Sequence, residues 1–143
     1  MRLRGELPPE DEEPEEDWAP ESIRTIMPYT TADGKQQFIV SSQGQFNGFI
    51  YICSIDEIRP LKAIPIQPDL LVTYMSHSIK SYGEMITIGY QTGGIELVMN
   101  GNFEKRMLVK YHDGGNGSIT ATCMTRDNNF FLSSAADGLL FVY

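Results

Sequence analysis

Few residues in this chain have the types and spacing that chemistry requires. The only histidines and cysteines are His77, His112, Cys53 and Cys123. Histidine and cysteine are common catalytic bases and nucleophiles, and a serine such as Ser133 or Ser134 would act as a nucleophile only beside a base. No base stands at a recognisable spacing from the serine pair, and the HExxH, CxxC, Walker and Gly-x-Ser-x-Gly motifs are missing. The sequence therefore predicts no catalytic, cofactor or metal site.

The glycine-rich run at 114–117 is the one segment that could suggest a phosphate cradle. A cradle of that kind uses the N-terminus of a helix, whereas this run precedes an expected strand. We interpret it as a loop between repeats. The two cysteines also fall on expected strands, where cysteine is typical of a small buried apolar residue rather than a disulfide, which favours a reducing, intracellular setting.

A repeat of about 45 residues occurs three times in the sequence, and the fold of this repeat would position any functional residue. Its strongest markers are Gly48, Gly94 and Gly138, which introduce the alternating runs NGFIYI, GGIELV and DGLLFVY. Another apolar strand precedes each: QFIVSS, MITIGYQT and FFLSSAA. Asn-Gly, Gly-Gly and Asp-Gly suit hairpin turns because such turns need positive φ. Four short strands at this period are typical of β-propeller blades.

The pattern predicts an all-β fold, part of a propeller with about three degenerate blades at 18–67, 68–112 and 113–143, the last lacking its fourth strand. The expected strands are 22–30, 37–42, 49–55 and 61–66, then 70–78, 85–91, 95–99 and 105–112, then 118–124, 130–135 and 139–143. Each blade is apolar on both faces and needs neighbours for stability.

Charge is concentrated at the N-terminus. Residues 1–21 hold nine acids against two arginines, while the whole chain has a net charge of −8. The nearly neutral remainder lacks the basic stripe of a nucleic-acid binder, and no apolar run is long enough to span a membrane. We expect 1–17 to be an acidic flexible arm, either a solvated linker or a contact for a basic partner. In the second case the contact residues are Trp18, Glu12, Glu13, Glu15 and Glu16.

The last repeat resembles the WD-repeat family. Ser133 lies four residues before Asp137, Tyr143 lies six after it, and His112 stands just ahead of the first strand. The resemblance implies that these four residues form a structural hydrogen-bond network, with Tyr143 in the place of tryptophan. The second repeat has Gly89, Gly93 and Met99 at the positions we match to the network, which implies that it has lost it.

Residues 11–143 resemble, more closely, the large axonemal WD-repeat proteins. The resemblance is carried by VKYHDGGNGSITATCMTRDNNFFLSSAADGLLFVY, NGFIYICSIDEIRPLKAIPI and the acidic opening EEPEEDWAPESI. It implies a non-catalytic scaffold in the axoneme of cilia or flagella, tethering dynein-associated complexes on doublet microtubules. The implied partners are axonemal proteins, dynein-associated factors and tubulin. A WD-repeat adaptor outside cilia and an enzyme built on a propeller are the alternatives.

Overall fold

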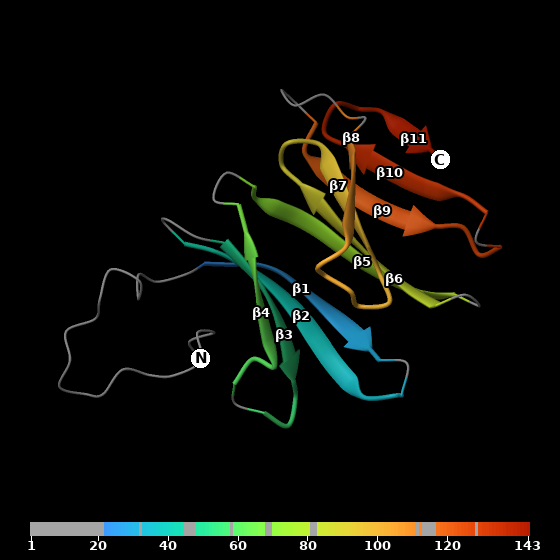
Figure 1. The fold of residues 1–143 in the computed structure, drawn as a ribbon. Coiled ribbons are helices and arrows are strands. Elements are labelled where there is room, and N and C mark those ends of the chain that lie inside the picture. The colour runs from blue at the N-terminus through green and yellow to red at the C-terminus, as the bar shows by residue number, and fades with distance from the viewer. Residues whose placement is uncertain are drawn as a thin grey trace. The chain divides into compact units, whose positions relative to one another are not determined.

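The computed structural model describes residues 22–31, 33–44, 48–57, 59–67, 70–80, 83–110, 112, 117–127 and 129–143. Strands and turns account for the described part of the chain, so the predicted all-β class is confirmed. The chain divides into two compact units, Met1–Asp69 and Leu70–Tyr143 (Figure 1). The expected arm at 1–17 and Trp18 lie outside the described residues.

Three antiparallel sheets contain the described strands, each joined in simple chain order. The first is β1 Ser22–Thr30, β2 Gln36–Gln43, β3 Gly48–Ser54 and β4 Lys62–Ile66. The second is β5 Val72–Lys80, β6 Gly83–Tyr90, β7 Gly94–Met99 and β8 Arg106–Lys110. The third is β9 Ile119–Met124, β10 Phe131–Ala135 and β11 Leu140–Val142. Each predicted blade therefore contains one sheet, and the expected strands agree with the observed ones to within about two residues.

The first unit is a single four-stranded sheet with buried residues on both faces. Ile39 and Val40 are adjacent on β2, so they point to opposite faces, and both are buried. Val40, Tyr51 and Cys53 pack together, and Phe49 stacks on Tyr51 at 5.6 Å between ring centroids. The expectation of a buried cysteine holds for Cys53, whereas Cys123 on β9 is exposed.

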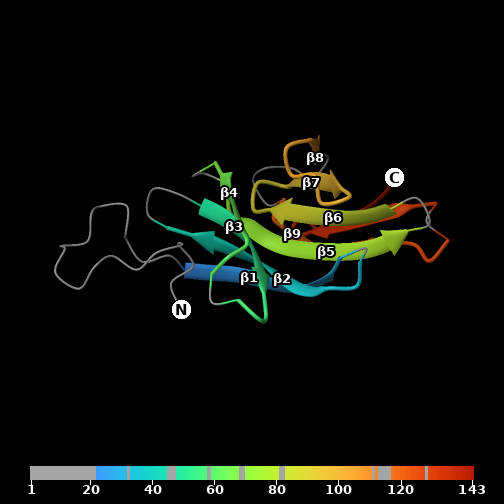
Figure 2. The same cartoon turned by 60° about the horizontal axis from the view of Figure 1, so that its bottom comes forward.

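The second unit stacks its two sheets (Figure 2), with β9 lying against β5 and β6. A glycine makes this close approach possible. A Cβ on Gly89 would lie 2.5 Å from Cγ2 of Ile119, closer than real side chains come. The surrounding core consists of Met85, Ile95, Ile119, Phe131 and Ala135.

The three glycines that mark the repeats, Gly48, Gly94 and Gly138, do not all lie in turns. Gly138 lies in the turn before β11 with φ +80°, a conformation that favours glycine. Gly48 and Gly94 are instead the first residues of β3 and β7. In the turn between β6 and β7 the positive φ belongs to Gly93, at +85°.

Candidate functional site

The four residues singled out by the family resemblance lie together in the second unit. His112 Nδ1 lies 2.9 Å from Asp137 Oδ2, and its Nε2 lies 2.9 Å from Ser133 Oγ. Ser133 Oγ also lies 3.0 Å from the Tyr143 hydroxyl. The His112 side chain is fully buried and that of Asp137 is 9% exposed. Segments separated by more than 20 residues are thereby joined through side chains.

The direction of each hydrogen bond follows from donor and acceptor chemistry. An ionised carboxylate only accepts, so Nδ1–H of His112 donates to Asp137. In a neutral imidazole Nε2 is then an acceptor, and the Ser133 hydroxyl donates to it. Ser133 Oγ can in turn accept from the hydroxyl of Tyr143. Every polar atom in this chain of bonds has a partner, which is the condition for burying it at low cost.

Local structure holds Asp137 and the imidazole in place. Asp137 sits in the turn between β10 and β11, where its Oδ1 accepts the backbone N–H of Leu139 at 2.9 Å. The ring of Phe141 meets the His112 ring edge-on at 4.7 Å between centroids. The ring of Tyr143 packs on that of Phe131, with 5.4 Å between the ring centroids. The turn thus positions the acceptor, and the aromatic rings fix the imidazole.

The order serine, histidine, aspartate is also that of a hydrolytic triad. A nucleophile must reach its substrate, but Ser133 is 1% exposed and His112 is 2% exposed. The serine oxygen already has two partners, the imidazole and the Tyr143 hydroxyl. The geometry therefore suits a structural tie and offers no approach for a substrate.

A buried hydroxyl recurs at the position of Ser133 in all three sheets. Ser41, Thr87 and Ser133 are spaced 46 residues apart, and each is nearly fully buried on the second strand of its sheet. Ser41 Oγ bonds Thr25 Oγ1 at 2.6 Å and accepts the Thr25 backbone N–H at 3.2 Å. Sequence reasoning missed this series, although its constant spacing was a readable signal.

The second sheet keeps a polar cluster of its own. Thr87 Oγ1 lies 2.5 Å from Ser76 Oγ and 2.6 Å from Thr122 Oγ1. Thr122 belongs to β9, so the cluster joins the second sheet to the third. Strand register aligns Thr87, not Gly89, with Ser133, because Thr87 pairs with Leu97 as Ser133 pairs with Phe141. This repeat lacks the histidine and aspartate of the network around Ser133, and Thr87, at the position that the sequence alignment gave to Gly89, forms a hydroxyl cluster instead.

A second buried polar group lies nearer the outer edge of the second sheet. The Tyr90 hydroxyl donates to Glu96 Oε2 at 2.8 Å, and Arg106 Nη1 lies 3.4 Å from the same oxygen. Burial, together with the negative charge of Glu96, raises the pKa of Tyr90 well above its usual range. Tyr90 therefore stays protonated and acts as a donor that holds the carboxylate.

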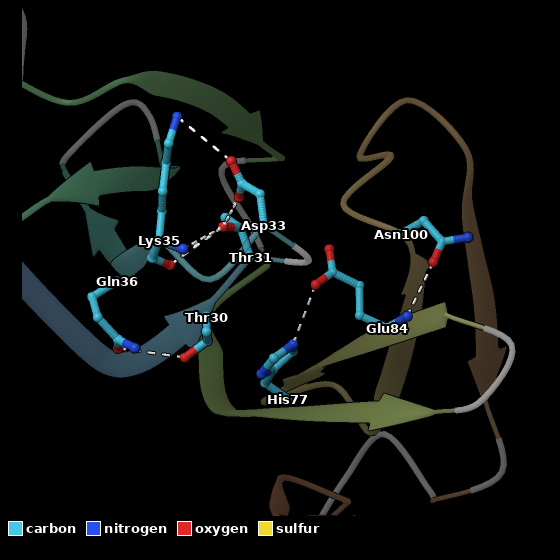
Figure 3. A network of polar contacts seen from close by, with 8 residues as sticks. All are labelled: Thr30, Thr31, Asp33, Lys35, Gln36, His77, Glu84 and Asn100. Carbon is cyan, nitrogen blue, oxygen red and sulfur yellow. Dashed lines mark hydrogen bonds and ion pairs between the residues drawn. The ribbon is translucent and has the colours of Figure 1, made fainter.

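Figure 3 shows polar contacts that are local to hairpins. In the second unit His77 Nε2 lies 3.5 Å from Glu84 Oε2, and the Glu84 backbone N–H donates to Asn100 Oδ1 at 3.0 Å. In the first unit the Thr31 hydroxyl donates to Asp33 in the turn between β1 and β2. Within the described residues no group of three or more histidine, cysteine or acidic side chains could hold a metal ion.

The fold is similar to that of solved β-propellers. The structure of the Dos1 propeller superposes with a TM-score of 0.60 at 17% identity, over 85% of this chain and 30% of that one. The BBS1N structure, described as a complex with ARL6DN, gives 0.57 at 14% identity, over 96% of this chain and 42% of that one. The chain thus spans less than half the length of either.

The sheets are therefore blades of the β-propeller type. No protein-family model matches the chain. No curated protein sequence matches it. Among the described residues, no helix has the length and apolar character needed to cross a membrane.

Proposed function

We propose that this chain is a non-catalytic, protein-binding scaffold segment of the ciliary and flagellar axoneme, which docks or tethers dynein-associated complexes on doublet microtubules. The observation that carries the scaffold role is the fully bonded, buried network around Ser133, because its serine, histidine and aspartate are bonded to one another and serve a structural purpose. The likeness to propellers, one of them described in complex with another protein, supports a role in binding proteins.

The axonemal part of the proposal rests on the resemblance of residues 11–143 to axonemal WD-repeat proteins, most of all to cilia- and flagella-associated protein 44. Degenerate blades that end in Phe141-Val142-Tyr143 instead of a tryptophan–aspartate pair carry this resemblance. The partners we propose are axonemal proteins, dynein-associated factors and tubulin.

Localisation in a motile ciliated cell tests this assignment. The tagged full chain should remain with the axoneme after detergent removes the membrane, and it should cross-link to dynein-associated factors. The matched control is the tagged Asp137→Ala variant, whose third sheet loses a carboxylate with two bonds to the protein and should be retained less. A signal confined to the cell body would instead favour the adaptor outside cilia.

The acidic segment at 1–17 is the part of the chain that we propose to contact a basic partner surface. Charge contacts of this kind are screened by salt over about 8 Å at physiological ionic strength. Deleting residues 1–17 should therefore slow association with axonemal partners at low salt and leave the unfolding of the remainder unchanged. Association that is insensitive both to salt and to the deletion would make the segment a passive linker.

A further inference from the structure

We draw no further inference here: the strongest candidate, the exposed apolar patch of Met107 and Leu108 on β8, the outer strand of the second sheet, carries none because nothing in the structure shows what covers it.

Discussion

The second and third sheets bury a hydroxyl at the same position and satisfy it with different chemistry. In the second sheet Thr87 bonds only other hydroxyls, those of Ser76 and Thr122. In the third sheet Ser133 bonds the imidazole of His112, whose other nitrogen reaches the carboxylate of Asp137. The position therefore requires a polar partner, but it does not require a particular one.

The two clusters also join different parts of the unit. The hydroxyl cluster connects β5 and β6 to β9, and so it joins one sheet to the next. The network around Ser133 connects His112, which precedes β9, to β10, to the turn after it and to Tyr143. The side-chain network therefore ties the strands of the third sheet to one another and to His112.

The largest loss of stability is expected when Asp137, a carboxylate with two hydrogen bonds to the protein, is removed. Asp137→Ala would leave Nδ1–H of His112 and the N–H of Leu139 without their acceptor, so we expect a loss of about 1–3 kcal/mol in stability. Native-state hydrogen exchange at the β10 amides measures it in the folded protein. The matched control is Asp127→Ala, which removes an exposed turn carboxylate. Equal effects for the two variants would contradict a structural role for the network.

A smaller loss is expected in the second sheet. Thr122→Val keeps the shape of the side chain and removes its hydroxyl, while Ser76 and Thr87 still bond each other. We expect a cost of about 1 kcal/mol, less than that of Asp137→Ala. A double-mutant cycle with Ser76→Ala should show coupling between the two positions. Additive effects would show that the two hydroxyls contribute independently.

The sequence predicted the strands well because turns and alternation are local signals. Asn100 and Gly101 both have positive φ, as the turn before β8 requires of that dipeptide. The residues of the network around Ser133 could be selected because one repeat kept a histidine, a serine and an aspartate at family spacing. Their burial and bonding depend on how β10 and β11 pair, which sequence alone does not give.

The hydroxyl pairs could not be predicted because the hairpins differ in length from repeat to repeat, so spacing in the sequence does not give the strand register. Thr25 and Ser41 bond across 16 residues, whereas Ser76 and Thr87 bond across 11, so the first strands of the repeats do not align at a constant spacing. A shift between Ile23 and Thr25 in β1 adds to the difference. Aligning the second repeat on its glycines then placed Gly89 where the ladder places Thr87.

The smallest expected effect concerns a turn that the third sheet shares with the first. In the first sheet the hydroxyl of Thr31, and in the third that of Thr125, lowers the pKa of the aspartate two residues on, Asp33 or Asp127. A carboxyl with a lowered folded-state pKa stabilises the fold above its unfolded pKa, and this contribution is lost as pH falls through the folded value. Both carboxyls are exposed, so stability should change little.

Carboxyl chemical shifts measured by NMR across a pH titration provide the readout. Thr125→Val should raise the midpoint of Asp127 toward that of an ordinary aspartate, and Asp33 should be unaffected because its own partner, Thr31, remains. Thr31→Val should do the reverse. If both midpoints stayed low in both variants, the bonds from the backbone, such as that from the Asn129 N–H to Asp127, would be the dominant cause and the threonine hydroxyls would be incidental.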